Sequence, residues 1–575
     1  MVEKTEQEKP LIFMCLLACA VGVIAGCGAW VFRRLIGLFH DLFFLGHISF
    51  AYDANVHTLQ DPWGALVIFA PVIGAVLVAW LVSTFAPEAK GHGVPEVMDA
   101  IYYNRARIRP VVAVVKSLAS AVCIGSGGSV GREGPIVQIG SAFGSTLGQI
   151  LRLPARQTAV LVACGAGAGI AATFNAPLGG VIFAIELLMA SVNARTVLPL
   201  TLATAIATHI GRALLGVNPS FDFPPLQVEQ FMLFSPFYLM LFVPFGGLLG
   251  LLGVAFVQGI YWAEDKFEAM PGNYYTRHML GMLVVGIIIY VLRWRTGYYY
   301  VEGVGYATIM DLLRGILTDP WFLLLLLALK LLATCLTLGS GGSGGVFSPA
   351  LFLGAVLGAI FFQVCHAAFP LVSLEGSAFI IAGMAAMVGS TTGAVITAAV
   401  MLMEMTGENS VVLPIIITTA TAYGVRIFLS PASIYTLKLL RRGHPVPEGL
   451  QSALLVAYQS KHVQSANFRI MEGTEILSAY NGVTVVVEQD EVTGLIGPVD
   501  EEEYRDVEAR RVDIERYLMV EESMPLVEII REMSSKDIHY AVVTKNPGSK
   551  KAEDVVGVMT ESELAVAIYK AAELL

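Results

Sequence analysis

The chemically informative residues of this sequence gather in a glycine- and serine-rich segment, GSGGSVGREGP, at residues 125–135. Glycines permit turns with positive φ, and such turns expose backbone N–H groups that can bind an anion. Pro135 fits the first turn of a helix, whose N-terminus directs further N–H donors and a partial positive charge at the loop. The segment therefore predicts a site that holds an anion by backbone dipoles, weakly enough for the anion to leave again.

Glu133 lies inside this segment. A carboxylate at the entrance to an anion site is itself an anion, so it can occupy the site, swing out of it, or take up a proton and leave. We therefore predict that Glu133 is a gate that responds to pH and to the competing ion. The alternative is a structural ion pair with a nearby base such as Arg132. We expect Gly131, Arg132 and Gly134 to form part of the anion site around this gate.

The same kind of segment occurs a second time in the chain. Residues 116–146 align without gaps with residues 330–360, and both stretches contain GSGGS followed by a glycine and a proline at matching positions. The position that matches Glu133 is Phe347, and the backbone N–H groups of Val346 and Phe347 can face the same anion. Duplicated apolar halves interrupted by glycines are typical of transporters, in which broken helices build an ion site near the middle of the bilayer.

A further stretch is duplicated as well. Residues 163–186 match residues 381–404, and this alignment pairs Glu186 with Glu404. Both acids lie on apolar segments, so they are either residues of the ion path or buried groups that bond to helix ends. We expect the second role, because a buried charge must be satisfied by hydrogen bonds.

Composition places these segments in a membrane. The chain is 55% hydrophobic and only 14% charged, whereas an average soluble domain has about 25% charged residues. A helix needs about 20 apolar residues to cross a bilayer. Runs of that kind recur at 11–31, 64–84, 197–215, 236–257, 278–293, 320–338, 350–370 and 411–429. We predict a multi-pass, all-α integral membrane protein, an inverted repeat of broken, tilted helices, with residues 1–444 as its transmembrane domain and repeat halves at about 10–215 and 235–440.

Residues 445–575 differ in character from the rest of the chain. They contain 24 Asp/Glu and 12 Lys/Arg, a net charge of −12, whereas the whole chain carries −10. Short β-branched runs alternate with helical patterns, which predicts a soluble α/β domain. Arg441 and Arg442 follow the last apolar stretch and favour the cytoplasmic side for this tail. An acidic surface argues against a nucleic-acid partner.

Cysteine usage and the N-terminus add two exclusions. The seven cysteines lie in or beside apolar segments, which fits neither a disulfide framework nor the spacing of a zinc site. The leader MVEKTEQEKP is mixed in charge rather than basic, so we interpret residues 11–31 as a retained first helix. We expect no metal and no cofactor.

The sequence resembles the CLC family of chloride channels and chloride/proton exchangers. Four stretches occur in family order: GHGVPEV at 91–97, GREGP at 131–135, GGVFSP at 344–349, and PASIYTLKLL at 431–440, which contains Tyr435. The resemblance covers about residues 10–442. It implies a homodimer with a separate pore in each subunit, bound chloride ions, and Glu133 as the external gate. It also implies that Val346 and Phe347 supply backbone donors and that Tyr435 offers its hydroxyl to the central ion; an interfacial tyrosine is the alternative for Tyr435.

His92 departs from the family's pattern. The family commonly has G-S-G-x-P at this loop, with a serine hydroxyl that contacts the central anion, whereas this chain has Gly91-His92-Gly93-Val94-Pro95. Imidazole can donate one N–H when neutral and two when protonated. Our hypothesis is that His92 contacts the anion and makes its affinity depend on pH near neutrality. The alternative is that His92 points away from the path. The preference among chloride, nitrate and bromide stays open.

Leu187 is the second departure. Exchangers of the family usually have a glutamate at this position that relays protons, and Glu186 matches the structural glutamate that precedes it. Because leucine cannot carry a proton, the sequence favours channel-like or uncoupled conduction. The alternative is a chloride/proton antiporter in which protons move through water. A fluoride-handling relative is a further alternative, although Phe347 and Tyr435 are the aromatic pattern of chloride-type members.

The tail resembles the CBS modules that many CLC proteins carry at this place. In such modules a Gly-h-h-Thr-x-x-Asp strand end holds an adenosine ribose. Here Thr560 stands three residues before Glu563, so glutamate replaces the aspartate. We expect a regulatory domain over residues 445–575 that supports the dimer, with adenine nucleotide binding at Thr560 and Glu563 as the less favoured alternative.

Two other classes of protein compete with an anion pathway. An intramembrane enzyme is not expected, because the chain has no HExxH and its histidines are scattered. A transporter of an organic solute would demand a larger polar or aromatic pocket than these paired glycine and serine loops predict.

Overall fold

The computed structural model describes residues 9–564 with the exception of residues 59–61, 190–191, 218, 222, 224–234, 445, 447–459, 461–463, 473–481, 497–510, 513–516, 525, 537, 547–548 and 561–562. The chain forms two compact units. The first, called the membrane body below, comprises Met1–Met189 and Ala194–Pro445, and the second, called the tail unit, comprises Ala190–Asn193 and Val446–Leu575.

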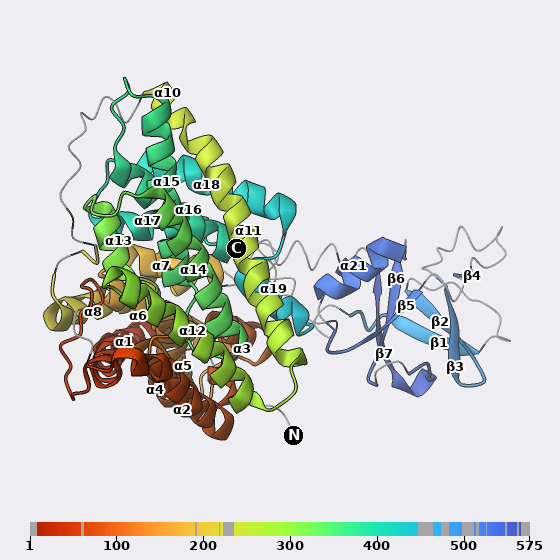
Figure 1. Cartoon of the computed structure of the whole chain (residues 1–575). Helices are drawn as coiled ribbons and strands as arrows, with labels where there is room; N and C mark the ends of the chain where they lie inside the picture. Colours follow the sequence, from red (N-terminus) through yellow and green to blue (C-terminus); the bar gives the residue numbers. More distant parts are fainter. Residues whose placement is uncertain are drawn as a thin grey trace. The chain divides into compact units, whose positions relative to one another are not determined.

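The regular elements in the described part of the membrane body are all helices. Its first half, drawn from red to yellow in Figure 1, contains α1 (Leu11–His40), η1 (Asp41–Leu45), η2 (Gly64–Ile68), α2 (Phe69–Phe85), η3 (Pro87–Ala89), α3 (Val94–Tyr103), α4 (Val111–Gly125), α5 (Glu133–Ile150), α6 (Ala155–Phe174), α7 (Pro177–Leu187) and α8 (Ala194–Leu215). Its second half contains α10 (Pro236–Met240), α11 (Phe242–Ala269), α12 (Tyr274–Thr296), α13 (Tyr306–Leu313), α14 (Pro320–Gly339), α15 (Phe347–Ala368), α16 (Gly376–Thr392), α17 (Val395–Thr406), α18 (Val412–Leu429) and α19 (Ile434–Arg441).

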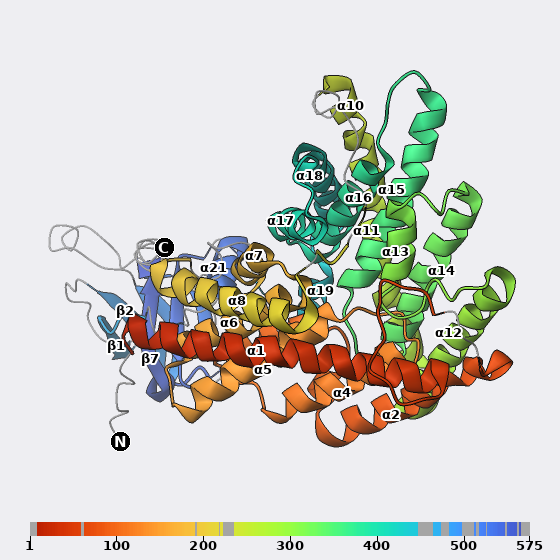
Figure 2. The same cartoon turned by 90° about the vertical axis from the view of Figure 1, so that its left-hand side faces the viewer.

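Many of these helices can cross a bilayer. Over the described residues, nine helical spans are long and apolar enough to do so, among them Pro236–Ala269 and Val412–Arg441. The helix α1 runs alongside α8 (Figure 2), and the two pack through small residues. A Cβ at Gly22 of α1 would lie 2.5 Å from the carbonyl oxygen of Ala203 in α8. Small residues at such contacts let the backbones of membrane helices approach closely. The expected multi-pass helical architecture is confirmed.

The two halves repeat the same helix breaks. Helices α4 and α14 end at Gly125 and Gly339, and helices α5 and α15 begin at Glu133 and Phe347, so both events recur 214 residues apart. Because both interruptions fall in the duplicated GSGGS segments, each half presents a loop followed at once by the N-terminus of a helix. The repeat predicted from the sequence therefore governs where the helices of the body begin and end.

The same glycines in each half bring the next pair of helices together. A Cβ at Gly140 would lie 2.1 Å from the carbonyl oxygen of Gly165, where α5 packs on α6. A Cβ at Gly354 would lie 2.2 Å from the carbonyl oxygen of Gly383, where α15 packs on α16. No side chain fits at either contact, so these glycines set the close approach of the helices that carry the two loops.

Helices α7 and α17 cap each other. The Glu404 carboxylate of α17 accepts hydrogen bonds from the backbone N–H groups of Leu178 (3.1 Å) and Gly179 (2.7 Å) at the start of α7. The Glu186 carboxylate of α7 accepts from the N–H groups of Ile396 (3.1 Å) and Thr397 (2.8 Å) at the start of α17. The expectation that these paired acids bond to helix ends is confirmed.

The tail unit is α/β. Its strands are β1 (Phe468–Glu472), β2 (Val483–Glu488), β3 (Glu491–Ile496), β4 (Arg511–Val512), β5 (Tyr517–Glu521), β6 (Tyr540–Thr544) and β7 (Val555–Thr560), and its described helices include α21 (Leu526–Lys536) and η7 (Ala552–Asp554). One sheet has the order β1-β2-β3-β4 and the other β5-β6-β7. Strands β5 and β6 are parallel and are joined through α21, whose Leu526, Ile529 and Met533 pack on the apolar face of the second sheet. The fold class predicted for this part of the chain is confirmed.

Candidate anion site

The two duplicated loops touch inside the membrane body. Gly131 and Gly345 exchange backbone hydrogen bonds, with both N···O distances 2.7 Å. A third loop joins them, because the N–H of Gly91 donates to the carbonyl oxygen of Gly342 (3.0 Å) and the N–H of Gly344 donates to that of Gly91 (3.3 Å). Segments that are far apart in sequence therefore meet at one point, as the repeat predicted.

Glycine is required where these loops cross. A Cβ at Gly134 would lie 2.0 Å from the carbonyl oxygen of His92, and one at Gly345 would lie 2.7 Å from the backbone nitrogen of Gly134. Any side chain at these two positions would push the loops apart. The predicted site residues Gly131 and Gly134 are thus brought together with His92.

Two helix N-termini open onto this crossing. Helix α5 follows Arg132 and helix α15 follows Val346, and neither residue caps its helix through its side chain. The first N–H groups of a helix have no intrahelical acceptor. Both termini also carry the positive end of a helix dipole. Val346 and Phe347, 1% and 3% exposed, are thereby placed at the point where a buried anion would be stabilised.

The carboxylate of Glu133 occupies the start of the opposite helix. Its Oε2 accepts a hydrogen bond from the backbone N–H of Ser348 in α15 (3.3 Å), and its Oε1 accepts from the hydroxyl of Tyr306 (2.7 Å) and from that of Ser348. The side chain is only 3% exposed. Together the Ser348 N–H, the Ser348 hydroxyl and the Tyr306 hydroxyl form what we call the seat of Glu133.

Arg132 does not pair with its neighbour. Its guanidinium lies over the rings of Phe174 (5.5 Å) and Tyr306 (5.2 Å), and its Nε is buried without a hydrogen-bond partner among the described residues. In the described part of the chain Glu133 is held by neutral donors rather than by a cation. The ion pair considered as an alternative from the sequence is absent there.

His92 lies at the crossing with a free ring nitrogen. Its side chain is 3% exposed, its ring packs edge-on against Tyr261 with 6.1 Å between centroids, and its Nδ1 has no hydrogen-bond partner among the described residues. The buried ammonium of Lys116 donates to the carbonyl oxygen of Gly91 (2.7 Å), directly before the histidine. A buried polar atom without a hydrogen bond is costly, so the Nδ1 of His92 is a candidate contact for a bound ligand.

Tyr435 is placed beside the same cluster. It lies in the first turn of α19 and is 2% exposed. The hydroxyl of Tyr261 donates to the carbonyl oxygen of Ile434 (2.5 Å), so Tyr261 contacts both the histidine loop and the start of α19. A capping box between Ser433 and Thr436 fixes that helix start.

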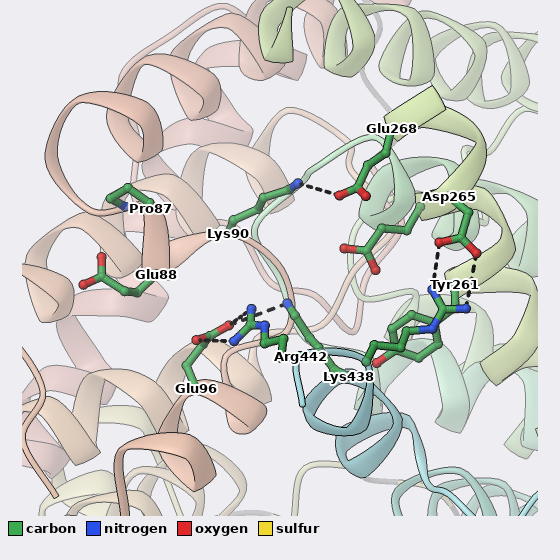
Figure 3. Close-up of a pocket in the computed structure, with 11 residues that line it drawn as sticks. Pro87, Glu88, Lys90, Glu96, Tyr261, Asp265, Glu268, Lys438 and Arg442 are labelled. Atoms are coloured by element: carbon green, nitrogen blue, oxygen red, sulfur yellow. Dashed lines mark hydrogen bonds and ion pairs between the residues drawn. The ribbon is translucent and has the colours of Figure 1, made fainter. Parts of the chain in front are cut away.

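Two pockets flank the cluster. An arginine-lined pocket of about 550 Å³ is bordered by Arg33, Arg132 and Arg314 and, among the described residues, by one acid, Asp53. A mixed-charge pocket of about 690 Å³, shown in Figure 3, is bordered by Tyr261 and by charged residues of η3, α3, α11 and α19. Arg132 lines the arginine-lined pocket and covers Tyr306 of the seat. Tyr261 lines the mixed-charge pocket and packs against His92. Each pocket therefore shares a residue contact with the crossing of the loops.

Ion pairs at the mixed-charge pocket join α3 and α11 to the end of α19. Glu96 of α3 accepts from Arg442 (2.7 Å) and lies 3.6 Å from the ammonium of Lys438 (Figure 3). Arg441 pairs with Asp265 of α11 (2.8 Å). Burial by itself would raise the pKa of Glu96, but the hydrogen bonds from Arg442 and the charge of Lys438 outweigh it and keep this pKa below its ordinary value. The acid is therefore ionised, and it ties α3 to the end of α19.

Comparison with known proteins assigns the chain to a family. Residues 74–426 match the family model described as voltage gated chloride channel. The chain belongs to that family. This membership confirms the resemblance to CLC proteins that the four motifs indicated, and with the helical spans it establishes a multi-pass integral membrane protein.

Individual CLC relatives agree with this assignment. An H(+)/Cl(−) exchange transporter, ClcA, from Vibrio parahaemolyticus is 32% identical over 453 residues, which cover 74% of this chain and 89% of that protein. The crystal structure of a slow cyanobacterial Cl−/H+ antiporter is 25% identical, covers 76% of this chain and 99% of its own, and superposes with a TM-score of 0.65. A eukaryotic CLC transporter is 18% identical with a TM-score of 0.62 over 96% of this chain and 98% of its own, which shows a shared fold.

Sequence reasoning missed Tyr306 and Ser348. A third repeated stretch could have pointed to Tyr306, because GHGVPEVMDAI at 91–101 matches GVGYATIMDLL at 303–313. The structure carries this symmetry: Lys116 donates to the carbonyl oxygen of Gly91 (2.7 Å), and the buried Lys330 donates to that of Gly303 (2.9 Å). The helix α13 that begins with Tyr306 is thus the counterpart of the α3 helix that follows His92.

The remaining predicted positions lie outside this cluster. Leu187 is half-buried at the end of α7, next to the capping residue Glu186. In the tail unit, the Glu563 carboxylate accepts hydrogen bonds from the backbone N–H (2.7 Å) and the hydroxyl (2.8 Å) of Thr560. The α/β fold there does not by itself identify a CBS module, and nucleotide binding at these two residues stays a prediction.

Proposed function

We propose that this CLC protein moves chloride across a membrane through the crossing of its duplicated loops, with Glu133 as the gate. The observation that carries the proposal is the place of the Glu133 carboxylate. This carboxylate accepts a hydrogen bond from a backbone N–H in the first turn of α15, where the dipole of that helix favours negative charge. Chloride would compete with the carboxylate for this N–H.

The neighbouring residues supply a route on either side of the gate. Among the described residues that line the arginine-lined pocket, three arginines outnumber one acid and would attract anions to the seat. Beyond the seat, the N–H groups of Val346 and Phe347 and the hydroxyl of Tyr435 are neutral donors for a central ion. Neutral donors bind an anion without trapping it, which conduction requires.

We further propose that His92 contacts this ion as a neutral donor through Nδ1. The unpartnered nitrogen supports the contact. Burial of His92 disfavours a charge on the imidazole, and the ammonium groups of Lys438 and Lys116, which lie beside the preceding Gly91, disfavour it further. We therefore propose that His92 stays neutral, and that anion affinity does not depend on pH near neutrality in the way expected from the sequence.

Coupling to protons separates two candidate functions. Leu187 offers no acid at the position where exchangers of the family usually have their proton glutamate, and this favours channel-like or uncoupled conduction. The names of relatives such as the H(+)/Cl(−) exchange transporter ClcA favour a chloride/proton antiporter instead. We propose uncoupled chloride conduction, with the antiporter as the second candidate.

Flux measurements on purified protein in liposomes test both proposals. We expect a chloride gradient to drive chloride movement in the wild type without stoichiometric proton uptake, because Leu187 cannot relay protons. We expect Glu133→Gln to conduct faster at neutral pH, since a neutral amide competes poorly with chloride for the seat. Anion and proton movements are recorded together with a chloride electrode and a pH electrode.

The two outcomes that contradict these proposals are distinct. Proton uptake in fixed proportion to chloride, abolished in Glu133→Gln, would establish the antiporter and refute uncoupled conduction. Equal chloride flux in Glu133→Gln and the wild type over the whole chloride range would refute Glu133 as the gate. A variant at Glu408, an acid outside the cluster, serves as a matched Glu→Gln control.

A further inference from the structure

Two hydroxyl groups close on the carboxylate of Glu133. The Tyr306 hydroxyl donates to Oε1 (2.7 Å), the Ser348 hydroxyl donates to the same oxygen, and the two hydroxyl oxygens lie 2.9 Å apart. Tyr306 is 1% exposed and Ser348 is fully buried. The three side chains come from α5, α13 and α15, so the contact joins both halves of the membrane body at one carboxylate.

The tyrosine is held firmly in this position. Its ring packs edge-on against Phe221, with 5.1 Å between centroids, and the guanidinium of Arg132 covers one face at 5.2 Å. The residue before it, Gly305, has φ of 80°, which lets the chain turn directly into α13. The ammonium of Lys330 fixes this turn by donating to the carbonyl oxygens of Val301 (3.0 Å) and Gly303 (2.9 Å). The hydroxyl is therefore pre-positioned for the carboxylate.

Three hydrogens are available to the carboxylate of Glu133. Tyr306 and Ser348 each have one hydroxyl hydrogen, and both can point at Oε1 while the N–H of Ser348 points at Oε2. Hydrogen bonds to a charged acceptor are about twice as strong as those between neutral groups. A chloride ion at the N–H of Ser348 would replace one of these three contacts, whereas the carboxylate makes all three at once.

We propose that Tyr306 and Ser348 form a latch that holds the ionised Glu133 in its seat and sets the chloride concentration needed to displace it. The latch rests on the proposed role of Glu133 as the gate. Tyr306 is a positioning residue, because it acts on the ion path through the carboxylate. Its effect on transport must disappear when that carboxylate is removed.

The test is a double-mutant comparison of chloride flux in liposomes. Tyr306→Phe removes one oxygen and leaves the ring in its packing, so the seat loses one hydrogen bond to a charged group, which corresponds to about tenfold or more in occupancy. We expect the chloride concentration for half-maximal flux to fall by about tenfold in Tyr306→Phe. We expect Ser348→Ala to lower the chloride concentration for half-maximal flux as well. This second variant tests the latch if Tyr306→Phe folds poorly.

Three further proteins distinguish the latch from a general disturbance of packing. Tyr300→Phe is the matched control, because this buried tyrosine precedes the same helix, and it should leave the chloride dependence unchanged. In a Glu133→Gln background, Tyr306→Phe should have no additional effect. An equal effect of Tyr306→Phe in both backgrounds would overturn the latch.

If Glu133→Gln alters flux but Tyr306→Phe and Ser348→Ala do not, the latch fails while the gate stands. If Glu133→Gln alters nothing, both fail.

Discussion

The imidazole of His92 shows what a single side chain contributes at the crossing of the loops. It is buried, its edge meets the ring of Tyr261, and its Nδ1 finds no acceptor or donor in the described chain. A serine at this position would offer a shorter donor with a freely rotating hydrogen. Histidine fills more of the space beside Tyr261 and fixes the direction of its N–H, so it should affect both how tightly an anion is bound and which anion is preferred.

Replacing His92 tests this role. We expect His92→Ala to raise the chloride concentration for half-maximal flux by about tenfold, because a hydrogen bond to a charged group is worth about 1.5–3 kcal/mol. His92→Ser should recover most of this affinity while changing the ratio of chloride to nitrate flux. Anion flux in liposomes with each ion measures both effects.

The same variants test whether the histidine stays neutral. With two ammonium groups next to its loop, we expect wild type and His92→Ser to have the same pH profile between about pH 5.5 and about pH 7.5, the range in which a free imidazole would titrate. A profile that changes in His92→Ser would show a protonated imidazole. Unchanged affinity and selectivity in both variants would show that His92 points away from the ion.

The residues of the site differ in how far the sequence could predict them. Glu133, Val346 and Phe347 were found because the gapless repeat placed two helix starts at one point, and the contact of Gly131 with Gly345 confirms that juxtaposition. Tyr306 and Ser348 were not found. The repeated stretch at 303–313 could have pointed to Tyr306, but only the tertiary structure shows that its hydroxyl and that of Ser348 meet the Glu133 carboxylate.

At the scale of helices, the exchange of carboxylates between α7 and α17 is the clearest consequence of the duplication. Each helix contributes a carboxylate to the N-terminus of the other, and each carboxylate accepts hydrogen bonds from two backbone N–H groups. The Glu186 carboxylate also accepts from the hydroxyl of Thr397 (2.7 Å). Neither acid needs a base to be satisfied, because the helix dipoles supply the positive charge.

Removing either charge should loosen this pair of helices. We expect Glu404→Gln to lower the free energy of unfolding by about 1–3 kcal/mol, since charge-assisted bonds to two N–H groups become weaker or are lost. Glu186→Gln should have a similar effect, and the double variant should cost less than the sum if the helices separate after the first change. Thermal unfolding of detergent-solubilised protein measures this. Unchanged melting temperatures in both single variants would mean that the caps are not stabilising.

Helix breaks were easier to predict than helix partners. The glycine and proline pattern predicted that α5 and α15 begin within the duplicated segments, and both do. The packing of α7 on α17 followed only indirectly, through the pairing of Glu186 with Glu404. Sequence periodicity reports which face of a helix is apolar, but in a membrane lipid and protein are both apolar, so it does not reveal which helix lies opposite.

At the scale of the whole molecule, composition alone separated two parts of the chain. Apolar runs predicted the helical membrane body, and the acidic segment after residue 444 predicted an α/β unit; the structure contains both. Propensity could assign strands such as β2 within the tail, but not their division into two small sheets. Within each sheet the neighbouring strands are consecutive in the sequence, such as β3 with β4, and only the pairing shows that one sheet ends at β4 and the other begins at β5.

The tail unit supplies the last prediction. In the nucleotide-binding pattern the acid at the end of the strand holds a ribose, but here the Glu563 carboxylate is occupied by the N–H and hydroxyl of Thr560, at 2.7 and 2.8 Å. A ribose would have to displace both bonds. We therefore expect ATP, ADP and AMP to leave the thermal unfolding of the full-length protein unchanged. Glu563→Asp, which shortens the side chain and restores the common pattern, is the matched variant. A stabilising shift in the wild type that Thr560→Ala abolishes would establish a nucleotide site.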